Sequence, residues 1–236
     1  MNKQGENGIN YVDYTWNPCT GCTHGCYYCY ARRIAERFKG TKAFPVGFTP
    51  TFHPDRLMEP AKVKQPSRIL VCSMGDLFDE GITLEQIRKI ANYTRLTKHT
   101  YLVLTKNRIR IPGPIGWHWP DNWWFGVSVT CRGETEKIYG LERPWILGNS
   151  WVSFEPLLDS IDADLRNIYW VVIGAMTGPG AIKPERRWVE KLIKAADNYN
   201  IPVFLKNNLL KLYPDLPRRQ EIPERMINHA PSKELG

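Results

Sequence analysis

The chain of 236 residues carries a net charge of +8, from 32 Lys and Arg against 24 Asp and Glu, and 42% of its residues are hydrophobic. This composition is close to that of soluble globular proteins, and the length fits one large domain or two small ones. No apolar run approaches the roughly 18 residues of a membrane helix, and the first thirty residues lack the pattern of a secretory signal. We therefore expect a cytoplasmic protein without a membrane partner.

Short apolar runs alternate with helical patterns along the chain. In chain order, we predict a strand over 9–16, a helix over 27–38, a strand over 68–73, a helix over 83–96, a strand over 100–105, a strand over 123–129, a helix over 133–147, strands over 150–155 and 169–175, a helix over 185–199 and a strand over 202–206. Thr83 and Gln86 have the spacing of a helix capping box.

Apolar strands spaced by helices predict a parallel sheet that is buried on both faces. We therefore expect an α/β fold, namely a partial (β/α) TIM-like barrel of parallel strands. It would form a single domain over residues 1–206. Residues 207–236 would be a basic C-terminal extension that packs on or near the barrel. In such a fold, functional groups gather in the loops after the carboxyl ends of the strands.

Four of the six cysteines lie in the segment CTGCTHGCYYC, residues 19–29. Cys22, Cys26 and Cys29 have the spacing C-x3-C-x2-C, and Cys19 lies upstream of them. In a reducing compartment, clustered cysteines are more often metal ligands or redox groups than disulfides. A structural zinc site normally uses two ligand pairs separated by a longer segment. The compact spacing therefore favours an iron–sulfur cluster, with a zinc site as the alternative.

The cysteine motif, with an aromatic residue at Tyr28, resembles that of the radical S-adenosylmethionine (SAM) superfamily. The resemblance implies a [4Fe-4S] cluster held by Cys22, Cys26 and Cys29, with one iron open to SAM. Cys19 would then be a spectator or lie beside the ligands, whereas a fourth ligand at Cys19 would close the cluster for electron transfer or structure. Tyr28 would lie at the cofactor. The resemblance also implies an external one-electron donor of the flavodoxin or ferredoxin type. SAM would be cleaved reductively to methionine and a 5′-deoxyadenosyl radical, which removes hydrogen from a substrate.

Further segments extend this resemblance over most of the chain. SMGDLF, LVLTKNR, FGVSV, SFEPLL, VVIGAMTGPGA and PVFLK occur in an order similar to that of a phage- and prokaryote-associated radical SAM family of unassigned substrate. The cysteine core is also similar to that of spore photoproduct lyase, a more distant relative that repairs DNA.

The segment SMGD matches by position the family's contact with the methionine amine of SAM, although Asp replaces the usual Glu and the first Gly is absent. Its residues are Ser73, Met74, Gly75 and Asp76. The alternative for Asp76 is a cap on the next turn. Ser128 would reach the ribose or carboxylate of SAM, or else pack in its strand. Glu155 would bind SAM or act on the substrate, unless it pairs with a nearby Arg or Lys.

Basic and aromatic side chains are candidates for substrate binding. Lys106 and Lys206 follow strands and would point cations at the mouth of the barrel. Arg108 and Trp117 belong to a Trp- and Arg-rich segment that would form a stacking platform for bases, or else a small satellite core. Cys131 follows a strand and is a candidate hydrogen-atom donor, a role known in spore photoproduct lyase.

These features predict a radical SAM enzyme whose substrate is a nucleic acid or a nucleotide. One alternative is a radical SAM enzyme that modifies a peptide or protein, which would usually need an extra docking domain or a second cysteine-rich region. The other is a non-catalytic iron–sulfur or zinc protein that binds nucleic acid. The basic net charge is compatible with an anionic partner but does not identify it.

Overall fold

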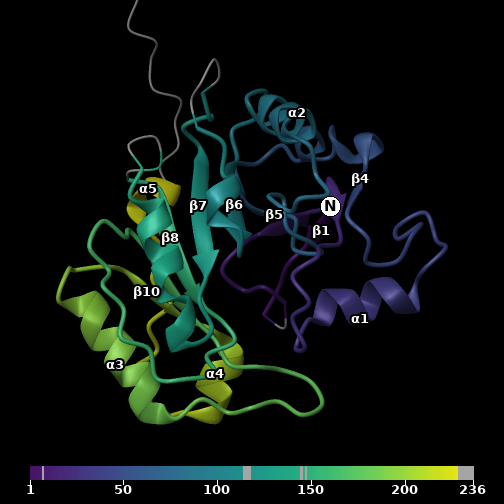
Figure 1. The fold of residues 1–236 in the computed structure, drawn as a ribbon. Coiled ribbons are helices and arrows are strands. Elements are labelled where there is room, and N and C mark those ends of the chain that lie inside the picture. Colours follow the sequence, from purple (N-terminus) through teal and green to yellow (C-terminus); the bar gives the residue numbers. More distant parts are fainter. Residues whose placement is uncertain (7, 114–117, 144–145, 147, 228–236) are drawn as a thin grey trace, which may run out of the picture. The chain divides into compact units, whose positions relative to one another are not determined.

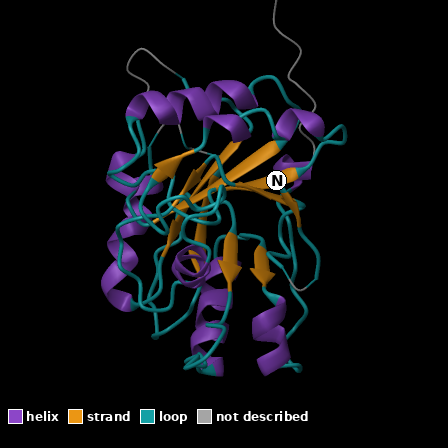
Figure 2. Cartoon of the chain, turned by 90° about the vertical axis from the view of Figure 1, so that its right-hand side faces the viewer, coloured by secondary structure: helices purple, strands orange, loops and turns teal. Residues whose placement is uncertain are grey.

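The computed structural model of the chain describes residues 1–6, 8–113, 118–143, 146 and 148–227. They form two compact units. The first unit holds 1–4 and 12–123, and the second holds the described residues of 5–11 and 124–227. Helices and strands are joined by long loops (Figures 1 and 2). None of the described helices has both the length and the apolar character needed to cross a membrane.

The first unit is built on four strands in the order β1-β2-β5-β6. They are β1 (Asn2–Lys3), β2 (Tyr14–Trp16), β5 (Arg68–Val71) and β6 (Thr100–Thr105). β2, β5 and β6 run parallel, and β1 is antiparallel to β2. A separate antiparallel pair, β3 (Cys19–Thr20) and β4 (Thr51–Phe52), leads into the cysteine segment.

Two α-helices and three short 3-10 helices accompany these strands. They are α1 (Tyr30–Arg37), α2 (Leu84–Thr94), η1 (Pro54–Arg56), η2 (Pro60–Lys62) and η3 (Arg108–Arg110). The capping box predicted for α2 is confirmed: the Thr83 hydroxyl accepts the backbone N–H of Gln86, whose side chain accepts the backbone N–H of Thr83.

The second unit has four parallel strands in the order β7-β8-β9-β10. They are β7 (Trp123–Ser128), whose first residue belongs to the first unit, β8 (Ser150–Phe154), β9 (Val171–Ile173) and β10 (Val203–Leu205). Its helices are η4 (Arg132–Leu141), α3 (Arg186–Asp197), α4 (Asn207–Leu212) and α5 (Glu224–Ile227). Parallel strands that alternate with helices confirm the α/β class.

Several predicted elements differ from the structure in extent or type. The first strand is confined to 14–16 and the strand predicted over 169–175 to 171–173, although the neighbouring Tyr11 and Val12 are buried. The helix predicted over 133–147 is a 3-10 helix, η4, which ends at Leu141. Gly133 and Gly140 lie within η4, and glycine lowers the stability of an α-helix.

The described part of the predicted C-terminal extension packs on the edge of β10. The backbone N–H of Leu205 donates to the carbonyl of Arg219 (2.8 Å), and that of Val203 donates to the Glu221 carboxylate (2.8 Å). The indole N–H of Trp170 donates to the Glu221 carbonyl (2.9 Å).

The second unit has an aromatic core in which one glycine is required. The rings of Trp151 and Trp170 lie 5.5 Å apart between centroids, and Tyr11 meets both edge-on. A Cβ atom on Gly126, in β7, would come well within 3.0 Å of the Trp151 ring. The buried indole therefore occupies the space that a side chain at position 126 would need.

Gly126→Ala should consequently destabilise the protein by overpacking, by about 1–3 kcal/mol. Chemical denaturation measures this free energy of unfolding. Gly133→Ala is the matched control, because a Cβ atom there meets nothing within 4 Å. Equal stability of the two variants would contradict the close packing at Gly126.

Candidate functional site

The three motif cysteines lie in one loop between β3 and α1, here called the cysteine loop (residues 21–29). Cys22, Cys26 and Cys29 are free thiols of intermediate burial. Cys29 is the N-cap of α1, where its Sγ accepts the backbone N–H of Arg32 (3.3 Å). Cys22 and Cys29 both pack against a buried apolar group, formed by Ala31, Ala35, Phe44 and Phe48. The cysteine loop is thus continuous with a helix and backed by a small core.

Two glycines bring the SMGD segment against the start of the cysteine loop. Gly21 and Gly75 form an isolated parallel bridge, and the backbone N–H of Gly21 donates to the carbonyl of Met74 (2.8 Å). Gly21 has φ of +81°, and a Cβ atom on either glycine would collide with backbone atoms. The resemblance matched Met74 and Gly75 by position, and the structure places both directly beside the cysteine motif.

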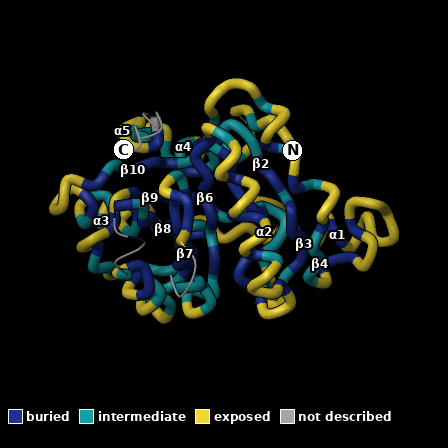
Figure 3. The backbone as a smooth tube through the Cα atoms, turned by 90° about the horizontal axis from the view of Figure 1, so that it is seen from above, coloured by how far each residue is buried: buried dark blue, intermediate teal, exposed yellow. Residues whose placement is uncertain are grey.

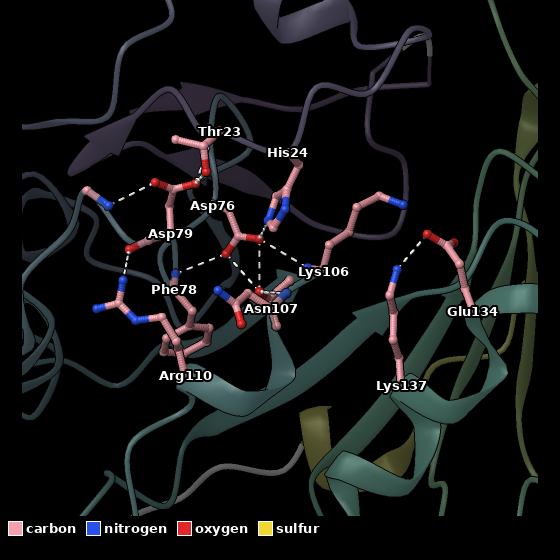
Figure 4. A network of polar contacts seen from close by, with 12 residues as sticks. Thr23, His24, Asp76, Phe78, Asp79, Lys106, Asn107, Arg110, Glu134 and Lys137 are labelled. Carbon is pink, nitrogen blue, oxygen red and sulfur yellow. Dashed lines mark hydrogen bonds and ion pairs between the residues drawn. The ribbon is translucent and has the colours of Figure 1, made fainter.

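Two buried carboxylates hold the spacer between Cys22 and Cys26 (Figure 4). Asp79 Oδ2 accepts both the backbone N–H (2.7 Å) and the hydroxyl (2.8 Å) of Thr23. Asp76 Oδ2 lies 2.8 Å from Nε2 of His24. Both aspartates follow β5 and are almost inaccessible to solvent. Thr23 and His24 of the cysteine loop are therefore held in place by the loop that follows β5.

Asp76 is engaged by further donors of the chain itself. Its carboxylate accepts the backbone N–H of Phe78 (2.9 Å), the Thr105 hydroxyl (2.8 Å) and the backbone N–H of Lys106 (3.0 Å). The bond to Phe78 is the turn cap considered above as the alternative role. The carboxylate also ties the end of β6 to the cysteine loop. A contact between Asp76 and SAM stays a prediction.

Polar residues missed by the sequence analysis complete this network. The side-chain carbonyl of Asn17, directly after β2, accepts the Met74 N–H (2.9 Å) and the Ser73 hydroxyl (3.2 Å). The guanidinium of Arg110 donates to the backbone carbonyls of Asp79 (2.5 Å) and Ile82 (3.0 Å). Asn17 directly follows a predicted strand, and this position could have identified it as a candidate site residue.

Cys19 is set apart from the three motif cysteines. It is fully buried and its thiol contacts that of Cys72, which is also buried. The hydrogen bond with Cys72 and the burial together raise the pKa of Cys19 well above its usual value. A protonated, fully buried thiol fits the spectator role implied by the resemblance.

The donor set fits an iron–sulfur cluster in its chemistry. Three thiols stand in one loop, and burial is the main cause that raises the pKa of Cys22 to about 12, so that metal binding there would release a proton. Within the residues that the structure describes, no three His, Cys, Asp or Glu side chains are grouped for a single metal ion. An iron–sulfur cluster does not require its cysteines to meet at one metal ion, because each cysteine binds a separate iron.

Tyr28 and Lys106 come together as two of the predicted site residues. The Lys106 ammonium lies 5.6 Å from the centre of the half-buried Tyr28 ring. Arg108 begins η3, two residues further along, and is partly exposed. A cation therefore stands beside the cysteine loop. Trp117 lies outside the described residues.

The other tryptophans around Trp117 do not form an exposed platform. Trp119, Trp123 and Trp124 are all buried. The rings of Trp119 and Trp123 are 4.9 Å apart, and Phe78 meets Trp119 edge-on. These rings form the satellite core that was the alternative interpretation.

The second unit brings three predicted residues together. The ammonium of Lys206, after β10, pairs with the Glu155 carboxylate, after β8 (2.5 Å). The Ser128 hydroxyl, at the end of β7, donates to the backbone carbonyl of Glu155 (3.4 Å). Gly174 leaves room for Glu155, since a Cβ atom there would collide with that side chain. Glu155 therefore has the basic partner considered as its alternative.

Cys131 lies at the start of η4 and is partly buried. Its neighbour Thr130 donates both its backbone N–H (2.7 Å) and its hydroxyl (2.8 Å) to Glu134, which also pairs with Lys137 (2.5 Å). These contacts order the turn around Cys131. Its role as hydrogen-atom donor stays a prediction.

Asp79→Ala should release the spacer of the cysteine loop, because Thr23 would lose two hydrogen bonds to a buried carboxylate. We expect a loss of about 1–3 kcal/mol in the free energy of unfolding of the metal-free protein and faster amide hydrogen exchange at Thr23. The control is Asp55→Ala, since Asp55 is half exposed and its ion pair with Lys42 is 3.6 Å long. Unchanged exchange at Thr23 in Asp79→Ala would contradict the anchoring role.

His53 predicts a dependence of stability on pH. It follows β4, and its Nε2 lies 2.8 Å from the Thr20 hydroxyl. Burial, and then the charge of Arg56, lower the pKa of His53 to about 4. The unfolded chain, with a histidine pKa of about 6.5, therefore binds the proton first as the pH falls.

The stability contributed by neutral His53 should be complete above about pH 6.5 and decline as the pH falls toward 4. Between pH 7 and 5, the parent should lose about 1–2 kcal/mol more than His53→Gln in denaturant titrations. His118→Gln, at an exposed histidine, should follow the parent. Parallel pH profiles of the parent and His53→Gln would refute the assignment.

Comparisons with known proteins give one family. Neither curated proteins nor solved structures yield a match. A family model described as "Protein of unknown function (DUF5131)" matches residues 6–209, most of the chain. The chain therefore belongs to the DUF5131 family.

Proposed function

We propose that this protein is a radical SAM enzyme in which Cys22, Cys26 and Cys29 hold a [4Fe-4S] cluster. The observation that carries the proposal is the anchored cysteine loop, whose spacer is hydrogen-bonded to Asp76 and Asp79. A loop that is ordered before its ligand arrives reduces the entropy lost on binding. The resemblance of the motif supplies the identity of the cluster and of SAM.

When bound, the cluster and SAM would supply one-electron chemistry that the chain's own groups lack. The three thiols would hold the cluster, and the apolar group behind Cys22 and Cys29 would keep water from that side. Lys106, beside the Tyr28 ring, would offer a cation to a carboxylate of SAM or a phosphate of the substrate.

The ion pair between Glu155 and Lys206 would contact SAM or the substrate. The Glu155 carboxylate can accept from an ammonium or hydroxyl group, while Lys206 and Ser128 can donate to phosphate or ribose oxygens. The proposal includes the partial (β/α) TIM-like barrel, in which the carboxyl ends of the parallel strands surround one site. A nucleic acid or nucleotide is the favoured substrate because the cysteine core resembles that of spore photoproduct lyase, and the net charge of +8 is compatible with such an anionic partner.

The test is anaerobic reconstitution with iron and sulfide, followed by electron paramagnetic resonance of the dithionite-reduced protein with and without SAM. We expect a [4Fe-4S] signal that shifts on addition of SAM, survives Cys19→Ala and disappears in Cys22→Ala. Cys19→Ala is the matched control, since that thiol lies in the same segment but pairs with Cys72. A signal that does not respond to SAM, or stoichiometric zinc in place of iron, would refute the proposal.

A further inference from the structure

Helix α1 exposes apolar and basic side chains on one face. Tyr30, Arg33, Ile34 and Arg37 have the spacing i, i+3, i+4, i+7, which places them on one side of a helix. Tyr30 and Ile34 are 44% and 40% exposed, and Phe38, which ends the helix, is 48% exposed. In Figure 3, much of the chain at and next to α1 has the yellow of exposed residues. These five residues are here called the α1 face.

The α1 face lies in a basic segment of the chain and contributes two of its arginines, Arg33 and Arg37. Residues 27–42 contain five Arg or Lys and one acidic residue, so they carry +4 of the net +8. Glu36 turns to the chain itself, where it accepts the backbone N–H of Phe48 (3.0 Å). Neither Arg33 nor Arg37 forms an ion pair with any described residue. Their charges are therefore available to an acidic partner.

The α1 face lies next to the cysteine loop, and this position indicates what a bound partner would do. Cys29 is the N-cap of α1, and the hydroxyl of Tyr30 donates to the carbonyl of Ser73 in the SMGD segment (2.7 Å). A protein seated on the α1 face would therefore sit directly beside the cysteine loop. Proximity of this kind is what electron transfer between two proteins requires.

We propose that the α1 face docks an acidic one-electron donor protein of the flavodoxin or ferredoxin type. The inference rests on the proposed function, because the cluster is the electron acceptor. In the transfer, the donor's reduced flavin or iron–sulfur group loses one electron and the oxidised cluster gains it, with no bond made or broken.

The composition of the α1 face favours a protein over a nucleic acid. Tyr, Phe and Arg are enriched in protein interfaces, and a few such residues carry most of the binding energy. Ile34 and Phe38 offer apolar contact area, whereas the aliphatic Ile34 cannot stack on a base. Arg33 and Arg37 would steer an acidic donor and make its association depend on salt.

The decisive experiment compares two reductants on the reconstituted protein. Arg33→Glu/Arg37→Glu should lower the rate of SAM cleavage driven by reduced flavodoxin at least tenfold at low salt, and leave the rate driven by dithionite unchanged. Ile34→Ser should weaken the flavodoxin-driven rate without altering its salt dependence. The charge-matched control is Arg187→Glu/Lys194→Glu on α3, which should behave as the parent with both reductants. Circular dichroism confirms that each variant folds.

The outcomes separate the two proposals. Normal dithionite-driven cleavage with equal flavodoxin-driven rates in the α1 and α3 variants would refute the docking site alone. Loss of binding to a single-stranded DNA oligonucleotide, with flavodoxin-driven rates unchanged, would show that the α1 face binds nucleic acid instead. No SAM cleavage by the parent with dithionite would refute both the function and the docking site.

Discussion

Two buried carboxylates from a single loop set the position of the cysteine motif. Asp76 and Asp79 are almost inaccessible to solvent, and a buried carboxylate is costly unless hydrogen-bond donors surround it. Those donors include Thr23 and His24 of the cysteine loop and Thr105 at the end of β6. The loop that carries the cysteines therefore also satisfies the buried charges.

The distance along the chain between interacting residues explains which parts of the site were predictable from the sequence. The cysteine spacing, the capping box at Thr83 and the order of strands and helices are local patterns, and each can be read from adjacent residues. The role of Asp76 is not local. Its partners His24 and Thr105 lie 52 and 29 positions away along the chain. Only the fold brings them together.

Packing decides between alternatives that the sequence left open. Trp119 and Trp123 stand near a basic, proline-rich segment that is compatible with an exposed platform or a satellite core, and both rings are buried against one another. Burial of large aromatic rings is strongly favourable, and neighbouring charged residues do not prevent it. Glu155 sits at a strand end as predicted, and its partner Lys206, directly after β10, lies 51 positions later in the chain.

The close approach of Gly21 and Gly75 makes the cysteine loop depend on distant parts of the chain. Gly75 follows β5, which pairs with β2, and the bonds from Thr105 and Lys106 to Asp76 come from the end of β6. The native shape of the cysteine loop therefore rests on contacts with segments that follow two later strands. A nascent chain released before residue 106 would still lack the contacts that order its thiols.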